Sequence, residues 1–325
     1  MNFRRFSRQV VTALTLLTPM AAIAADGFPQ RPITLVVPFA PGGGNDSLAR
    51  IVAAKAGEVL GGVIVVENRP GAGGGIAAQA VAKARPDGYT LLQGNIAHAI
   101  NMSLYAKPGY DIVKDFEPVT MIATSPLLFC VPPRLGVKTM KEFVELAKSK
   151  PGSLNYGSSG MGGASHLAVE LLKAKTGIEL QHIPYQGSGP SVTDLLAGRL
   201  DLALPAISSA PPLMQAGKIV CLSSTSSVRS KSLPDMPATA EALGIDEYEA
   251  LPWYGILAPK GTPPAIVSAL AEAVKKAVED PKVRDALTKQ GFDVQVDTPD
   301  NFRTYITAEV DKWSQVVKES GAKAE

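Results

Sequence analysis

The chain has 325 residues, of which 46% are hydrophobic and 19% are charged, and its 32 basic and 30 acidic residues give a net charge of +2. This composition is typical of a globular protein with two domains of ordinary size, and it excludes a disordered or collagen-like chain. Because no basic stripe or Lys/Arg cluster stands out, we expect no nucleic acid as a partner.

Residues 1–24 are predicted to form a secretory signal peptide. Arg4, Arg5 and Arg8 precede an apolar run at 10–17, and Ala-Ile-Ala at 22–24 has the small-x-small pattern of a cleavage site. The general secretory route is favoured, and the Arg4-Arg5 pair leaves the twin-arginine route open. Cleavage would remove three Arg and no acid, so 29 basic residues would face 30 acidic ones. We therefore expect a periplasmic protein that holds any anionic ligand by local contacts.

The first predicted elements are a strand at 33–37, a glycine-rich loop and a helix at 46–60. Three glycines in a row, Gly42 to Gly44, allow another molecule to approach the main chain, and a helix N-terminus carries roughly +0.5 of a charge. A plain turn is the alternative interpretation, but this position at the end of the first strand favours anion binding. Asp46 is expected either to accept from a ligand or to cap the helix.

Strands and helices alternate through the rest of the first half. We expect a strand at 63–66, a glycine-rich turn into a helix at 76–84, a strand at 89–93 and a loop at 94–98. This alternation predicts right-handed βαβ units, with ligands bound beyond the carboxyl ends of parallel strands. The second glycine-rich turn matches a dinucleotide-binding loop poorly, because Ile76 replaces its third glycine.

The apolar run at 121–131 is interrupted at 124–126, as expected of a strand that leaves one domain and enters another. A second series repeats the first: a strand at 154–156, a Gly/Ser loop at 157–165 and a helix at 166–175, then a strand at 180–183 and a helix at 191–197. Ser191 and Asp194 are expected to form its capping pair. The remaining elements are expected as helices at 140–148, 263–278, 281–290 and 299–318, and strands at 200–204, 218–223, 253–259 and 292–296.

Cys130 and Cys221, the only cysteines, lie in apolar β-type runs. An exported protein can form a disulfide, but a chain of this size can build a core without one. Free buried thiols are therefore the favoured interpretation. If the bond forms, we expect it to be dispensable.

The sequence contains no recognisable catalytic motif. Gly157-Ser158-Ser159-Gly160 is not the G-x-S-x-G motif, and His98, His166 and His182 lack the HExxH spacing of a zinc site. His166, at a helix start, is more often a local hydrogen-bonding residue than a catalytic one, and His182 is more often part of a strand. We expect no catalytic residue, no cofactor and no metal.

Seven ordered stretches nevertheless resemble one family, the Bug/TctC extracytoplasmic solute-binding receptors of tripartite tricarboxylate transporters. They are PFAPGGGND at 38–46, VVENRPGAGG at 65–74, PDGYTLL at 86–92, YDIVKDFEPV at 110–119, NYGSSGMGGASHLAVEL at 155–171, HIPYQGSGPSVTDLLAGRLD at 182–201 and LAPKGTPPAIV at 257–267. The chain departs from the family at Met102, at Ala238 and at both cysteines, all outside the glycine-rich loops.

The resemblance implies an α/β, two-lobed, type II periplasmic-binding-protein-like fold with two crossing strands and a ligand cleft between the lobes. Lobe 1 would comprise 25–124 and 251–325, and lobe 2 would comprise 125–250. The implied partners are a small carboxylate (a dicarboxylate, an aromatic acid or an amino acid) and the membrane permease subunits of a tripartite tricarboxylate transporter. A sensor that signals to a membrane kinase is the alternative. We expect a monomer.

The resemblance also implies which residues line the cleft. In lobe 1 they are Phe39, Ala40, Gly43, Gly44, Asp46, Asn95 and Ala97, and in lobe 2 they are Ser158, Ser159, Gly163, Ser165, Tyr185, Gly187 and Pro205. Because these loops contain no Arg or Lys, we expect main-chain N–H groups at 43–44 and 158–159, hydroxyls such as that of Ser165, and water to bind the carboxylate. Gly43→Val is expected to abolish binding by blocking this space and forcing a poor φ.

Overall fold

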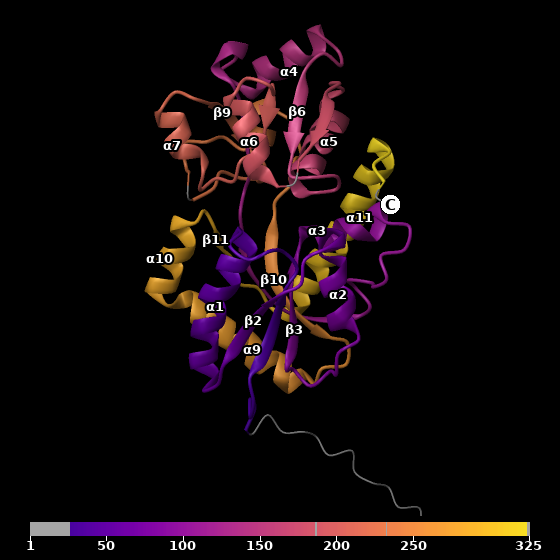
Figure 1. Ribbon diagram of the computed structural model, residues 1–325, viewed down its shortest axis with the longest axis vertical. Coiled ribbons are helices and arrows are strands. Elements are labelled where there is room, and N and C mark those ends of the chain that lie inside the picture. Colours follow the sequence, from indigo (N-terminus) through magenta and orange to yellow (C-terminus); the bar gives the residue numbers. More distant parts are fainter. Residues whose placement is uncertain (1–26, 186, 232, 324–325) are drawn as a thin grey trace, which may run out of the picture.

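The computed structural model describes residues 27–185, 187–231 and 233–323, which form two α/β lobes, one above the other in Figure 1. The predicted signal peptide lies outside the described residues. One lobe contains a six-stranded sheet with the order β11-β4-β10-β3-β1-β2, and the other contains a five-stranded sheet with the order β7-β6-β8-β5-β9. The α/β, two-lobed architecture expected from the sequence is confirmed.

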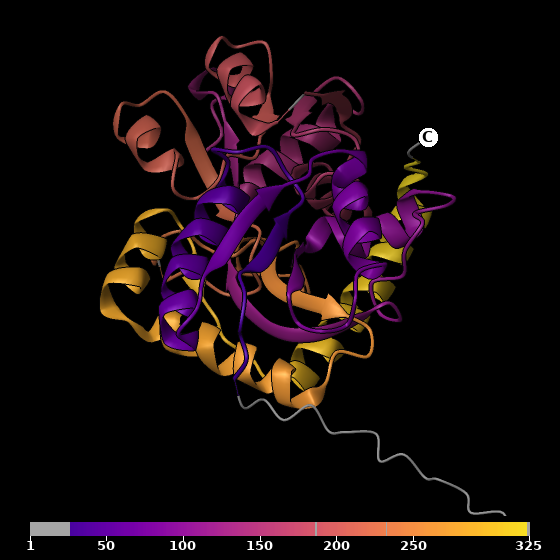
Figure 2. The same ribbon diagram turned by 60° about the horizontal axis from the view of Figure 1, so that its bottom comes forward.

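The first lobe is built on a mixed sheet that helices cover on both faces (Figure 2). Its strands are β1 (Ile33–Val37), β2 (Ile64–Asn68), β3 (Thr90–Asn95), β4 (Phe116–Thr124), β10 (Trp253–Pro259) and β11 (Asp293–Val294). Its helices are α1 (Gly44–Leu60), η1 (Ala72–Gly74), α2 (Gly75–Ala82), α3 (Ile96–Leu104), α9 (Pro264–Glu279), α10 (Pro281–Lys289) and α11 (Pro299–Ser320). Ile33, Leu35 and Val37 pack on the α1 and α9 side, whereas Val36 packs on the α2 and α3 side. Burial on both faces explains why β1 is an almost continuous apolar run.

The second lobe has a smaller sheet. Its strands are β5 (Leu128–Val131), β6 (Asn155–Ser158), β7 (Gln181–Pro184), β8 (Leu202–Ala203) and β9 (Val220–Ser224), and its helices are η2 (Pro133–Leu135), α4 (Met140–Ser149), α5 (Ala164–Thr176), α6 (Ser188–Leu196), α7 (Ala210–Gln215) and α8 (Thr239–Leu243). β6 pairs in parallel with β7 and β8. β5 pairs antiparallel with β8 and β9.

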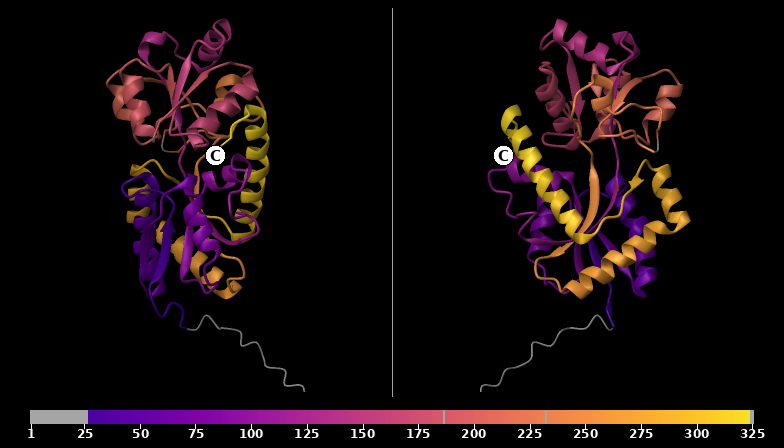
Figure 3. Two further views of the ribbon diagram at one scale, coloured as in Figure 1. Left: turned by 45° about the vertical axis from the view of Figure 1, so that its right-hand side comes forward. Right: turned by 180° about the vertical axis from the view of Figure 1, so that it is seen from behind.

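Two segments cross between the lobes. β4 ends at Thr124 in the first sheet and β5 begins at Leu128 in the second, and the chain returns ahead of β10. The segments touch where Ser125 N–H donates to the Pro252 carbonyl at 2.9 Å. Seen from behind, α11 and α10 flank the crossing segments (Figure 3).

Helix α11 links the crossing region to both lobes, because it packs on α3 in the first and reaches α5 in the second. Its buried Glu309 accepts hydrogen bonds from two indole N–H groups, those of Trp253 on β10 at 3.2 Å and Trp313 on α11 at 2.9 Å. This carboxylate ties the helix to the returning strand. None of the described helices combines the length and apolar character required to cross a membrane.

The two cysteines are joined by a disulfide, so the prediction of free thiols was wrong. Cys130 and Cys221 stand directly opposite each other in the antiparallel pair of β5 and β9. They are 91 residues apart in sequence, so only the register of the sheet reveals that they meet.

Several helices begin earlier than predicted, and α1 and α5 each begin two residues early, at Gly44 and Ala164. Helix α3 begins at Ile96 inside the expected loop, because Asn95 and His98 form a capping box in which an imidazole replaces the usual Glu or Gln. Helix α6 begins at Ser188 and not at 191. The predicted capping pair was therefore wrong: Ser191 Oγ donates to the Ser188 carbonyl, and Asp194 accepts from Tyr185.

Candidate functional site

Three helices begin at the carboxyl ends of parallel strands with glycine as the N-cap. These are α1 after β1, α5 after β6 and α6 after β7, with Gly43, Gly163 and Gly187 as N-caps. Within the described residues, none of the three has a side-chain hydrogen bond to its first turn. Strand β6 points from its lobe towards the other (Figure 1). The first-turn N–H groups of an α-helix lack partners inside the helix, so these starts suit an anion.

Asp46 fixes the first-lobe loop, which we define as residues 38–45. Its buried carboxylate accepts from Gly42 N–H, Arg50 Nε and Asn68 Nδ2, each at 3.0 Å. The hydrogen bond from Arg50 is the main reason that the pKa of Asp46 is lowered to about 2. Arg50 also pairs with the second oxygen, so the protein occupies both oxygens of the carboxylate. Asp46 is neither the N-cap nor an open acceptor; it holds the loop in shape.

The start of α3 lies beside the start of α1. Asn95 Nδ2 donates to Asn45 Oδ1 at 3.4 Å, and Gln93 Nε2 donates to the Asn45 carbonyl at 3.0 Å. Asn95 Oδ1 accepts from Ala97 N–H at 2.9 Å, which uses one donor of α3. The structure thus gathers the first-lobe residues of the predicted site around these two helix starts.

The glycine that needs its conformational freedom is Gly42, and not Gly43. Gly42 has φ +85°, a value that favours glycine, whereas Gly43 has φ −84°. A Cβ added at Gly43 would have its nearest neighbour, the Ala40 carbonyl oxygen, at 3.9 Å. The predicted backbone strain in Gly43→Val was therefore wrong, because the turn places its positive φ one residue earlier.

The second-lobe loop, residues 158–165, uses most of its polar groups internally. Ser159 N–H donates to Ser165 Oγ at 2.8 Å, and the two hydroxyls are 3.0 Å apart. Ser158 is fully buried, with its Oγ 2.6 Å from His182 Nε2. The N–H group of Ser159 is therefore already paired, although the sequence suggested it as a ligand donor. The first turn of α5 remains for this role.

Neighbouring segments complete the second-lobe side. Tyr185 N–H donates to the Ser158 carbonyl and Gly187 N–H to the Ser159 carbonyl, both at 3.1 Å, while the Tyr185 hydroxyl donates to Asp194 at 2.7 Å. Pro205, beyond β8, is buried and its carbonyl accepts from Leu128 N–H.

The exposure of the predicted site residues divides them into three groups. Exposed residues are Ala40, Gly43 and Gly44; partly buried ones are Phe39, Ala97, Ser159, Gly163, Tyr185 and Gly187; buried ones are Asp46, Asn95, Ser158, Ser165 and Pro205. The accessible groups are mostly main chain and small side chains. Asn45, Asn68 and Gln93 were missed, although each stands at a strand or helix end where an amide can tie loops together.

The lobes touch on either side of these loops. A Cβ on Gly162 would collide with Leu104 at the end of α3, and one on Gly291 would lie 2.7 Å from Ile207 Cγ2. Gly162 lies in the second lobe and Gly291 in the first, so glycine on each side lets the two lobes approach each other closely.

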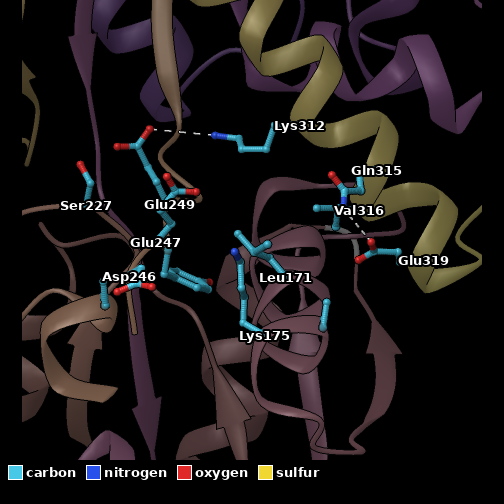
Figure 4. A pocket seen from close by; sticks show the side chains of 13 residues that line it. Leu171, Lys175, Ser227, Asp246, Glu247, Glu249, Lys312, Gln315, Val316 and Glu319 are labelled. Carbon is cyan, nitrogen blue, oxygen red and sulfur yellow. Dashed lines mark hydrogen bonds and ion pairs between the residues drawn. The ribbon is translucent and has the colours of Figure 1, made fainter. Parts of the chain in front are cut away.

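A separate cavity of about 740 Å³ lies between α11 and the second lobe (Figure 4). None of the predicted site residues lines it. Its charged lining residues are Asp246, Glu247, Glu249, Glu319, Lys175 and Lys312. Lys312 pairs with Glu309 and, at 3.9 Å, with Glu249, so the charge left at the cavity is acidic and disfavours a carboxylate.

Known proteins similar to this chain are solute-binding receptors. The family model "Tripartite tricarboxylate transporter family receptor" (TctC) matches residues 48–322. BugT of Bordetella pertussis is 36% identical over 325 residues, covering 99% of each chain.

Two solved structures are also similar. "R. palustris Rpa4515 with adipate" is 38% identical with a TM-score of 0.79, covering 90% of this chain and 98% of that one. MatC from Rhodopseudomonas palustris with bound malate is 34% identical with a TM-score of 0.76, covering 89% and 100%. The chain therefore belongs to the tripartite tricarboxylate transporter receptor family, TctC, a family of solute-binding receptors and not of enzymes.

Proposed function

We propose that this protein is a periplasmic solute-binding protein that captures a small carboxylate between its lobes. As a monomer, it would deliver this ligand to the membrane permease subunits of a tripartite tricarboxylate transporter. The observation that carries the proposal is that α1, α5 and α6 start with uncapped glycines at the strand ends of both lobes. The adipate and malate bound by two relatives support a dicarboxylate.

The binding chemistry follows from the groups that remain accessible. First-turn N–H groups of α1 would meet one end of the ligand, and those of α5 and α6 would meet the other. The partly buried Ser159 hydroxyl and bridging water would complete the contacts. A micromolar Kd requires about −8 kcal/mol, which several such contacts and cleft closure can supply.

Binding would be coupled to closure because the ligand would touch both lobes, which the described chain connects through two crossing segments. A ligand that contacts both sides stabilises the closed arrangement by its differential affinity for that state. The permease would then recognise the closed pair of lobes.

A thermal-shift screen of the chain from residue 25 onwards tests the proposal. We expect malate, adipate or another carboxylate from a panel that includes aromatic acids and amino acids to raise the melting temperature. A ligand at 100 times its Kd adds about 2.7 kcal/mol of stability. The corresponding neutral amides and diols are the matched controls. Stabilisation by a neutral compound, with none by any carboxylate, would contradict the proposal.

A further inference from the structure

We propose that His166 and His182 are positioning residues that, as neutral imidazoles, hold the second-lobe loop so that the start of α5 faces the ligand. This inference rests on the proposed function. The two rings are stacked directly behind the loop, with centroids 4.1 Å apart and an angle of 15° between their planes. His166 comes from the first turn of α5 and His182 from β7, so the stack joins two elements that flank the loop.

His166 fixes the residue that precedes the N-cap of α5. Its Nδ1 accepts from Gly162 N–H at 3.0 Å. Gly162 has φ +70° and lies against Leu104 of the first lobe, so its placement sets both the helix start and an interlobe contact. Because Nδ1 accepts, the ring proton is assigned to Nε2, which faces Glu170 at 4.0 Å.

His182 fixes the other end of the loop through Ser158. His182 Nε2 lies 2.6 Å from Ser158 Oγ, and this hydroxyl accepts from Gly160 N–H and donates to the Gly160 carbonyl, both at 3.1 Å. With His182 as donor, all three hydrogen-bonding positions of the hydroxyl are filled. The fully buried Ser158 is thus a link between the imidazole and the main chain at Gly160.

Some main-chain N–H groups of the second-lobe loop are paired within the protein, and others remain available to a ligand. The N–H groups of Ser159, Gly160 and Gly162 are paired with Ser165 Oγ, Ser158 Oγ and His166 Nδ1. No described side chain caps α5, so its first-turn N–H groups remain available to a ligand. The positive end of the helix dipole lies at the same place. The neutral imidazoles hold the start of α5 in position without adding a charge beside it.

The surroundings of the pair keep both rings neutral. Burial, followed by the neighbouring His182 and Lys173, lowers the pKa of His166 strongly, and burial lowers the pKa of His182. The ionisable groups facing the pair are Glu170, Lys173 and Tyr156. Lys173 pairs with both Glu170 oxygens, at 2.8 and 2.9 Å, and the Tyr156 hydroxyl donates to the same carboxylate. Burial outweighs the effect of Glu170, which acts to raise the pKa of His182, and the net direction is downward.

Matched substitutions test the inference. The side-chain oxygen of His166→Asn can replace Nδ1 as an acceptor, and the amide of His182→Gln can replace Nε2; His166→Leu and His182→Leu remove these groups. With adipate or malate, whichever binds the unmodified protein, we expect each Leu variant to raise the Kd about tenfold and each amide variant to restore it to within about threefold.

A readout without ligand separates this inference from the proposed function. Amide hydrogen exchange at Gly160 and Gly162 should become about tenfold faster in the Leu variants, while exchange in α1 of the other lobe stays unchanged. If no carboxylate binds, the proposed function fails and exchange still decides the positioning role. Unchanged exchange with unchanged Kd overturns the inference, and so does failure of the amide variants to restore either quantity.

If a Leu variant does not fold, nitrogen-15 NMR of the unmodified protein replaces it. We expect His166 to be unprotonated at Nδ1 and protonated at Nε2 at pH 7. A proton on Nδ1 overturns the inference.

Discussion

The two loops that flank the cleft have the same plan but are held by opposite means. Each joins a parallel strand to a helix that starts with an uncapped glycine. The first-lobe loop is held by an ion pair, Asp46 with Arg50, whose guanidinium side chain is 53% exposed. The second-lobe loop is held by hydroxyls and neutral imidazoles, of which His166 is buried and His182 is partly buried. The same arrangement of strand, loop and uncapped helix start can thus be organised by an ion pair with one exposed partner or by neutral groups.

Of the changes considered, acidification should reduce stability most and should affect the two lobes differently. His98, buried in the first lobe, has its pKa lowered by burial to about 4, and His166 in the second has its pKa lowered to about 3. A histidine whose folded pKa lies below its unfolded value binds more protons when unfolded, so stability is lost as pH falls from 6.5 towards 4. Asp46, with its pKa lowered to about 2, loses its contribution only below about pH 4.

We expect the histidines together to remove on the order of 5 kcal/mol of unfolding free energy between pH 7 and pH 4. Because His166 and His182 both lie in the second lobe, its amides should lose protection first. Urea unfolding and hydrogen exchange as functions of pH measure this. A flat profile between pH 7 and 4 would show that the imidazoles are not buried in neutral form.

Removal of the disulfide should have the next largest effect. The bond closes a 91-residue loop within the second lobe, and its loss is expected to cost about 2–4 kcal/mol. Cys130→Ala with Cys221→Ala should weaken protection in the second lobe and leave the first unchanged, while the protein still folds and binds. Hydrogen exchange resolved by lobe provides the test. Equal loss in both lobes would show that they unfold as one unit.

Asp46→Ala should cost about 2 kcal/mol, because it removes the acceptor of the Gly42, Arg50 and Asn68 hydrogen bonds. Ser165→Ala, the counterpart in the second lobe, should cost about 1 kcal/mol because it removes one acceptor of a main-chain N–H group. Urea unfolding compares the two, with Asp46→Asn as the control that keeps an acceptor. A larger loss of unfolding free energy in Ser165→Ala than in Asp46→Ala would contradict the stronger stabilising role assigned to Asp46.

Two adjacent glycines should show the smallest effects on stability. Gly42→Ala is expected to cost about 1 kcal/mol because of its positive φ, whereas Gly43→Ala should be nearly neutral. Gly43→Val should instead lower ligand affinity, because the side chain enters the space at the start of α1. Calorimetry with unchanged circular dichroism measures this. Retained affinity in Gly43→Val would mean that the first-lobe loop is only a turn.

Local patterns carried most of the fold prediction. The glycine run at 42–44 marked the start of α1, and the break at 124–126 marked where the chain passes from β4 to β5. Helix α3 was missed at its start because the partner of Asn95 in its capping box is a histidine. Helix α6 was predicted three residues late because Ser191 and Asp194, which match a capping pair, make other hydrogen bonds.

Long-range partners could not be predicted. Cys130 meets Cys221 only through the register of β5 and β9. Asp46 was expected to cap its helix or bind a ligand, but Arg50 and Asn68, one helical turn and one strand away, use its oxygens instead. The contacts of Cys130 and Asn68 depend on which strands become neighbours, and no local pattern contains that information. The Asp46–Arg50 pair is different, because it is an i,i+4 contact on one helix.

The carboxylate shared by the two indoles gives the protein a built-in optical probe. Trp253 and Trp313 are the only tryptophans in the chain, and both donate to Glu309 beside the returning strand. Nearly all of the indole emission therefore originates from one place, where α11 is tied to β10. If the lobes rotate about the crossing segments, the emission wavelength and intensity of the unlabelled protein should change at that moment. Stopped-flow mixing with a ligand could then follow the rotation in real time.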